Sequence, residues 1–233
     1  MDQAQLFTGF LWFMAFLFST TVHEAMHALA AYRGGDPTAY HGGQVSLSPV
    51  PHIRREPIGM LVVPLLTALS QGWAIGWAST PYNARWASLY PTRAAVMAAA
   101  GPLGNLVIAG SALILLRVGL GAGWFAAPAT VTFERLVEAG GGPTALMATL
   151  VSILVVLNVL LAAFNMIPLP PLDGASVIGI FLPRHASERM RELSGTPMFQ
   201  LAGLLLAWRI FPELVRPLFR LILWLVHPDL TYS

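Results

Sequence analysis

Three ionisable side chains, His23, Glu24 and His27, lie within the otherwise apolar stretch FLFSTTVHEAMHALAAY. Residues four positions apart share one face of a helix, so both imidazoles are able to reach the same metal ion. Glu24 stands beside them, where a carboxylate is able to act as a base on a water molecule. A pair of histidines that merely packs between helices is the competing interpretation. A carboxylate in a membrane helix is costly unless it is paired or ligates an ion, which favours the metal site.

A third ligand is expected from another part of the chain, because a catalytic zinc takes three protein ligands and leaves one position open. The sequence contains no cysteine, so these ligands must be histidine or carboxylate. Asp36 and Asp173 are the aspartates near apolar segments. Asp173 stands in NMIPLPPLDG, where prolines end a helix at membrane depth, and unwound backbone at that depth must be buried or line a polar cavity. An ordinary Asp-Gly turn is the other interpretation of Asp173.

The composition indicates that these residues are positioned by membrane helices. Of the 233 residues, 56% are hydrophobic and 10% are charged, whereas soluble domains carry about a quarter charged residues. The sequence therefore predicts an all-α polytopic membrane protein with a single domain, 1–233. Its core is expected at about 6–182, followed by a C-terminal helical region at about 197–226. The basic residues are all arginine and are scattered singly or in pairs, which does not indicate nucleic-acid binding.

The hydropathy pattern predicts about five to six transmembrane helices, with a re-entrant segment. Pro212 and Pro217 interrupt the last apolar region, which is expected to form two short helices or one broken hairpin. The Gly- and Pro-containing loop 33–56 holds the alternating run QVSLS, a possible strand of a short membrane-associated β-hairpin. The apolar segments are 6–32, 57–79, 94–116, 145–167 and 197–226.

The charge distribution predicts the orientation. The first five residues carry an acid and no base, which favours a retained first helix with its N-terminus outside. Arg33, Arg54 and Arg55 follow the histidines, so the active site is expected near the cytoplasmic side. Asp173 returns to the depth of the histidines only if one apolar segment does not cross the membrane. A re-entrant hairpin at 57–79 meets this condition.

Three motifs resemble the signatures of the site-2 protease family of intramembrane zinc metalloproteases, in its compact prokaryotic form without a PDZ or nucleotide-binding appendage. They are HEAMH at 23–27, GPLGN at 101–105 and NMIPLPPLDG at 165–174. The resemblance implies that His23, His27 and Asp173 bind Zn²⁺, that Glu24 is the general base and that Asn165 forms hydrogen bonds with the substrate backbone. It further implies regulated intramembrane proteolysis in a prokaryotic cell membrane.

The function expected from these features is hydrolysis of peptide bonds within or near transmembrane segments of substrate proteins. QVSLS would hold an unwound substrate by strand addition. Asn105 either packs helices or faces the catalytic cavity, where it would contact the substrate. The alternative function is a non-proteolytic membrane protein that binds or transports a metal. Glu24 argues against that alternative, because transport needs the ligands and not a base. A scaffold would explain neither the histidine spacing nor Asp173.

Overall fold

The computed structural model describes residues 3–229 and is built around four long apolar helices. In this part of the chain, these four helices are long and apolar enough to cross a membrane. The all-α prediction is confirmed, but the number of such helices is below the expected five to six. They are α1 (Gln3–Arg33), α6 (Pro91–Gly121), α7 (Gly142–Asn165) and α10 (Pro197–Val226).

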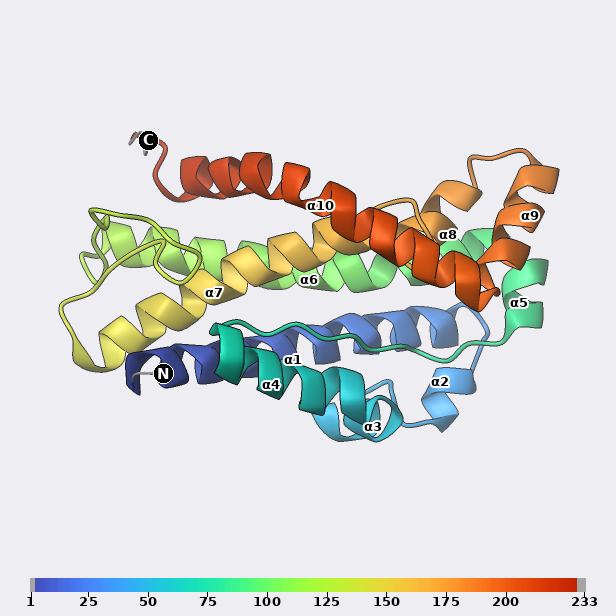
Figure 1. Cartoon of the computed structure of the whole chain (residues 1–233), viewed down its shortest axis with the longest axis horizontal. Helices are drawn as coiled ribbons and strands as arrows, with labels where there is room; N and C mark the ends of the chain where they lie inside the picture. Colours follow the sequence, from blue (N-terminus) through green and yellow to red (C-terminus); the bar gives the residue numbers. More distant parts are fainter. Residues whose placement is uncertain (1–2, 230–233) are drawn as a thin grey trace.

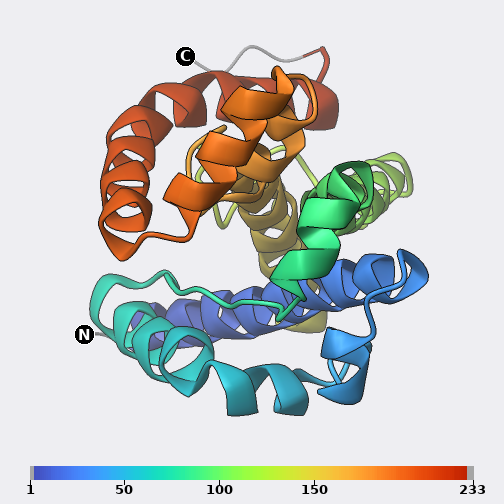
Figure 2. The ribbon, with the colours of Figure 1, turned by 90° about the vertical axis from the view of Figure 1, so that its right-hand side faces the viewer.

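Helix α7 joins two apolar clusters. On one side Leu157 packs with Trp12 and Phe16 of α1. On the other side Val155 packs with Leu116 of α6 and with the end of α10. The view in Figure 2 separates α1 and α4 at the bottom from α9 and α10 at the top. The histidine-bearing helix is thus held on one side of α7.

The region 197–226 forms one continuous helix, which corrects the expectation of two short helices or a broken hairpin. Pro212 and Pro217 both lie inside α10, and the helix bends along its length (Figure 1). Each proline removes only one helical hydrogen bond, whereas a loop would leave several backbone groups unpaired in apolar surroundings. The helix therefore continues through both prolines.

Segment 57–79 runs beside α1 toward the N-terminal part of that helix and then returns, as the re-entrant prediction requires. It comprises a π-helical turn (Ile58–Val62) and α4 (Val63–Gln71), which ends at Gly72 with a left-handed φ of 82°. The chain then returns in an extended conformation beside α1 (Figure 1). Trp77 N donates a hydrogen bond to Gly59 O at 3.0 Å, so the outgoing and returning parts are in contact. A Cβ on Gly59 would overlap the Trp77 carbonyl, which explains the glycine.

The predicted strand at QVSLS is not formed. Residues 45–47 form bends, and the β-bridges in the described residues are isolated pairs at Ala126–Glu138 and Thr132–Arg135. The serines explain the difference, because their hydroxyls bind neighbouring backbone groups and compete with strand pairing. Ser46 Oγ accepts from Ser48 N at 3.1 Å, and Ser48 caps the next helix, α3 (Pro49–Arg55). The possible membrane-associated hairpin is therefore absent at this position.

Short helices complete the fold at the end of the molecule where Arg33 lies. Asp36 connects two of them across the re-entrant segment. Its Oδ1 accepts from Thr38 N at 3.0 Å, and its Oδ2 accepts from Asn83 N at 2.7 Å. The segment 37–82 is thereby closed by one carboxylate. The short helices are α2 (Thr38–His41), α5 (Ala84–Leu89), α8 (Asp173–Gly179) and α9 (Arg184–Ser194).

Candidate metal centre

The candidate centre begins with two adjacent turns of α1. His23 and His27 are 7% and 5% exposed, and their rings meet edge to face with centroids 4.5 Å apart. Their Nε2 atoms are 2.9 Å apart. Glu24, between them in sequence, is 5% exposed. The helical spacing predicted from the sequence thus places both imidazoles on one buried face.

Asp173 joins this pair from the far end of the chain. Helix α7 ends at Asn165, and α8 begins at Asp173 after a run containing three prolines. A Cβ on Gly174 would overlap Met166 O, so glycine permits α8 to start against the end of α7. Asp173 Oδ2 lies 3.3 Å from His23 Nε2 and 3.4 Å from His27 Nε2. The fold therefore selects Asp173, and not Asp36, to meet the histidines.

The other ring nitrogens show which atoms are available to a metal. His27 Nδ1 lies 2.7 Å from the Met97 carbonyl, which only accepts, so this nitrogen carries the hydrogen. His23 Nδ1 lies 2.6 Å from Asn105 Oδ1 and donates in the same way. In the neutral rings both Nε2 atoms then have lone pairs directed at each other. This is the tautomer found in metal-binding histidines whose second nitrogen is hydrogen-bonded.

Nε2 of His23, Nε2 of His27 and Oδ2 of Asp173 therefore converge with their lone pairs, and no hydrogen lies between them to form a hydrogen bond. Asp173 Oδ2 is buried and has no hydrogen-bond partner among the described residues. One proton would satisfy only part of this set, whereas a divalent cation satisfies all three atoms at once. Two imidazoles and one carboxylate form a ligand set found in catalytic zinc sites. The residues present therefore fit zinc.

Gly101 of α6 forms a wall of the centre. A Cβ built at this position would overlap Nε2 of both His23 and His27. Only glycine leaves the space in front of these nitrogens open. Gly101 belongs to the GPLGN motif, but the sequence does not indicate this role, because the role depends on contact with another helix.

Thr80 is a further residue that sequence reasoning missed. It belongs to the extended part of the re-entrant segment, and its hydroxyl lies 2.6 Å from Glu24 Oε2 and 3.0 Å from Glu24 O. A hydroxyl that donates to the carboxylate fixes its direction. The only sequence signal was its place in STPYN, a polar run between apolar segments.

The two asparagines expected near the substrate occupy different environments. Asn165 is half-buried at the end of α7, and its Nδ2 donates to Leu161 O at 3.0 Å. Asn105 is fully buried and contacts His23 Nδ1. The structure thus places Asn105 behind a candidate ligand, between helices, instead of on an open surface.

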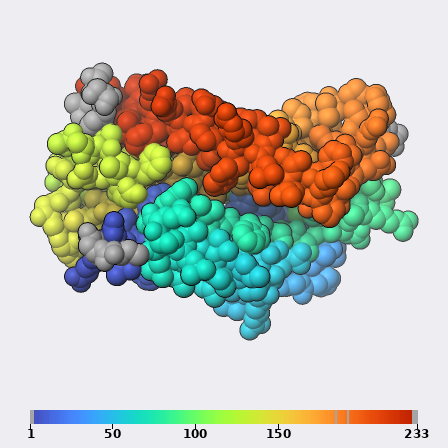
Figure 3. Space-filling model, in the orientation of Figure 1, coloured from blue at the N-terminus to red at the C-terminus, as the bar shows by residue number. Residues whose placement is uncertain are grey.

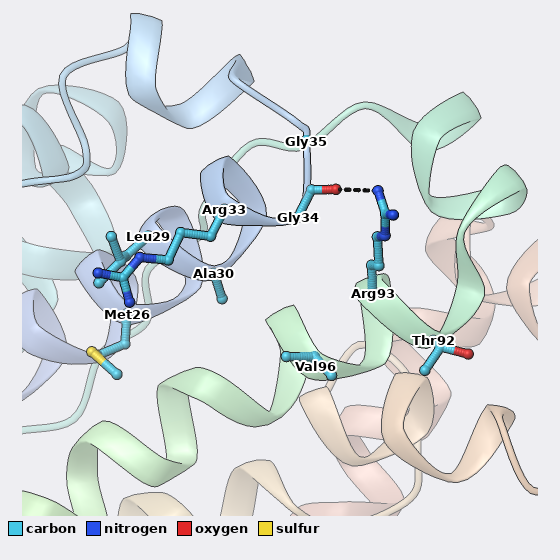
Figure 4. Close-up of a pocket in the computed structure, with 9 residues that line it drawn as sticks. All are labelled: Met26, Leu29, Ala30, Arg33, Gly34, Gly35, Thr92, Arg93 and Val96. Atoms are coloured by element: carbon cyan, nitrogen blue, oxygen red, sulfur yellow. Dashed lines mark hydrogen bonds between the residues drawn. The ribbon is translucent and has the colours of Figure 1, made fainter.

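The hollow of about 550 Å³ between the end of α1 and the start of α6 is separate from the metal centre. Met26, Arg33, Arg93 and Val96 are among its lining residues, which include none of the three candidate ligands (Figure 4). Arg93 donates to Gly34 O at 3.1 Å across it. A second depression is a furrow between α10 and the re-entrant segment, and α1 is visible at its floor (Figure 3). Both depressions border α1, the helix that carries the histidines, and the hollow does so through Met26 and Arg33.

Comparisons with known proteins agree with this chemistry. The family model described as Peptidase family M50 matches residues 11–208. The Bacillus subtilis (strain 168) protein named "Putative zinc metalloprotease YwhC" is 31% identical over 176 residues, which cover 75% of this chain and 70% of that protein. No solved structure matches the chain.

Proposed function

The chain belongs to Peptidase family M50, a family of intramembrane zinc metalloproteases, and from this membership we propose that it is a zinc metalloendopeptidase whose zinc is held by His23, His27 and Asp173. It is an integral membrane protein with Zn²⁺ as its cofactor. The observation that supports the ligand assignment is the convergence of three donor atoms within 4.8 Å of one another. When bound, zinc supplies Lewis acidity that polarises the scissile carbonyl and activates water.

Glu24 is the proposed general base. It follows a ligand directly in the sequence, it is buried, and the Thr80 hydroxyl orients its carboxylate. In the proposed reaction, the Glu24 carboxylate accepts a proton from the attacking water and passes it to the nitrogen of the leaving amine. Thr80 holds Oε2, which keeps the carboxylate in one orientation during both transfers.

The proposed substrates are membrane-embedded proteins. A substrate helix has its carbonyls in hydrogen bonds, so it must unwind before hydrolysis. The extended backbone 73–83 replaces 44–48 as the proposed strand partner, because it approaches Glu24 through Thr80. Asn165 Oδ1 makes no hydrogen bond within the described part of the chain and is the proposed acceptor for a substrate N–H. The furrow between α10 and the re-entrant segment is the proposed entry route (Figure 3).

The proposed location is a prokaryotic cell membrane, with residues 1–233 acting as one intramembrane domain. The N-terminus is proposed to lie outside, with the metal centre near the cytoplasmic side. The arginines after α1 support this orientation. The re-entrant segment accounts for the common depth of the ligands, because a segment that returns to the side it came from allows α7 to deliver Asp173 to the depth of the histidines.

Two variants separate this function from metal binding without proteolysis. Glu24→Gln preserves size and hydrogen bonding but removes the base, so zinc content should remain while cleavage of a single-span substrate falls about 100-fold or more. His23→Ala should lose zinc and cleavage together. The assay needs a panel of single-span proteins with Gly, Pro or Asn in their helices, since these residues ease unwinding. Full cleavage by Glu24→Gln at normal zinc content would favour the metal-binding alternative.

A further inference from the structure

A fully buried polar network lies behind His23 and joins three membrane helices. It consists of Ser19 of α1, Asn105 of α6 and Asn158 of α7, each with 0% exposure. Buried amides must find hydrogen-bond partners, because an unpaired polar group in apolar surroundings is costly. The network is therefore expected to have one preferred arrangement of donors and acceptors.

The hydrogen bonds form a chain from a backbone carbonyl to the histidine. Asn158 Nδ2 donates to Leu154 O at 2.9 Å and to Ser19 Oγ at 2.8 Å. Asn158 Oδ1 then accepts from Asn105 Nδ2 at 2.8 Å. Asn105 Oδ1 remains to accept from His23 Nδ1 at 2.6 Å. A weaker contact of 3.4 Å from Asn105 Nδ2 to Ser19 O favours the same orientation.

The orientation of this series of hydrogen bonds is fixed at the Leu154 carbonyl, where the series begins. Leu154 O is a carbonyl and only accepts, so it selects the NH₂ end of Asn158. Reversing Asn158 would place its oxygen against the Leu154 carbonyl. Reversing Asn105 alone would place two amide oxygens against each other. Each reversal replaces a buried hydrogen bond with a repulsive contact, so the orientation passes from one amide to the next.

His23 needs such control more than His27 does. The partner of His27 Nδ1 is the Met97 carbonyl, which has no donor to offer. The partner of His23 Nδ1 is a side-chain amide, which is able to present either an acceptor or a donor. A reversed Asn105 would donate to Nδ1 and transfer the ring hydrogen to Nε2, where it would block the ligand atom.

We propose that Asn158 is a positioning residue that, through Asn105, keeps the hydrogen of His23 on Nδ1 and leaves Nε2 free for the metal. The consequence for zinc rests on the proposed function, whereas the consequence for the tautomer does not. Asn158 touches neither the ligands nor the substrate in this arrangement. Its effect is transmitted by hydrogen-bond orientation.

The test compares variants of the full-length protein by two measurements. The first is ¹⁵N NMR of histidine-labelled, metal-free protein, which reports the tautomer of His23. The second is the dissociation constant of zinc, measured by competition with a chelator. Asn158→Leu removes the acceptor and both donors at similar size. Asn158→Asp is the conservative variant, because burial among neutral groups favours the protonated acid, whose hydroxyl is able to donate to Leu154 O and whose carbonyl is able to accept from Asn105.

Ser152→Ala is the matched control. Ser152 is also on α7 and 0% exposed, but its hydroxyl donates to Ala148 O and accepts from Leu136 N, away from His23. The substitution Ser152→Ala therefore removes a buried, hydrogen-bonded hydroxyl from α7 and leaves the network of Ser19, Asn105 and Asn158 intact. Any general loosening of α7 should appear in this variant too.

The expected result is that Asn158→Leu gives a mixture of His23 tautomers and weakens zinc binding about tenfold, the lower end of the range for outer-shell partners. Asn158→Asp and Ser152→Ala should keep the wild-type tautomer. If the leucine variant does not fold, Asn158→Ala carries the same expectation. An unchanged His23 tautomer in Asn158→Leu, or in Asn158→Ala where that variant replaces it, overturns the proposal. A change of the same size in Ser152→Ala overturns it as well. Wild-type protein that binds no zinc would instead refute the proposed function, while the metal-free NMR comparison still tests the network.

Discussion

The Thr80 hydroxyl donates to Glu24 Oε2 at 2.6 Å and connects the re-entrant segment with the helix that carries the histidines. The two residues are 56 positions apart in the sequence. The contact places an extended piece of backbone next to the proposed base. Movement of the re-entrant segment would therefore change the position of Glu24.

Thr80→Val should reduce cleavage without removing zinc. Valine has nearly the same shape as threonine but lacks the hydroxyl, so the Glu24 carboxylate loses the group that orients it. We expect kcat/KM for a single-span substrate to fall about tenfold or more, since small misplacements of reacting groups cost up to about 100-fold. Thr80→Ser should restore most of the activity. Wild-type turnover by the valine variant would show that Thr80 does not position the base.

Gly101→Ala should impair zinc binding. The added Cβ would overlap Nε2 of both histidines, so either the rings or α6 must move. We expect zinc affinity to fall about tenfold or more, measured by chelator competition. Gly110→Ala is the matched control, because Gly110 lies on the same helix and a Cβ there meets no atom within 4 Å. Equal zinc affinity in the two variants would contradict the assignment of Gly101 as a wall of the centre.

Asp36 should stabilise the fold in a pH-dependent way. Burial raises the pKa of its carboxyl group, but the hydrogen bonds from Thr38 and Asn83 outweigh burial and leave the pKa below its ordinary value. A carboxyl group whose pKa is lower in the folded state contributes stability above its unfolded pKa of about 3.9. That contribution is lost as the pH falls through the folded pKa.

Asp36→Asn should therefore destabilise the protein at pH 7 and matter less near pH 3. In either orientation, the NH₂ of the amide would oppose one of the two backbone N–H groups, of Thr38 or of Asn83, at a cost of about 1–3 kcal/mol. The measurement is the difference in thermal midpoint between wild type and variant, in detergent, as a function of pH. Asp229→Asn, at an exposed aspartate, serves as the control. A difference that stays constant from pH 7 to pH 3 would rule out this role for the carboxylate.

The proposed orientation predicts opposite labelling of two exposed positions. The chain has no cysteine, so Tyr82→Cys and Trp124→Cys each provide a single reactive thiol. Both side chains are 53% exposed, and they lie at opposite ends of α6. An impermeant maleimide should label position 82 only from the cytoplasmic side and position 124 only from outside. Labelling of both from one side would refute the topology, and the reverse pattern would invert it.

The sequence by itself determined the membrane class and two of the three candidate ligands. Composition fixes the class, because so few charges cannot cover a soluble surface. His23 and His27 follow from local geometry, since a spacing of four on any helix gives a shared face. Two predictions from local patterns were wrong. Helix α10 continues through two prolines that were expected to break it, and QVSLS, the predicted strand, forms bends in which a serine hydroxyl binds nearby backbone. Local patterns indicate a tendency, and the surroundings decide the outcome.

The tertiary structure decided which residues complete the centre. The prolines before Asp173 favour it over Asp36 in the sequence, and the structure shows that Asp36 closes the re-entrant segment whereas Asp173 reaches the histidines. Gly101, Thr80 and Asn158 acquire their roles only through contacts between helices that are distant in the sequence. No periodicity encodes such contacts, because they depend on how α1, α6 and α7 pack together and on where the re-entrant backbone returns.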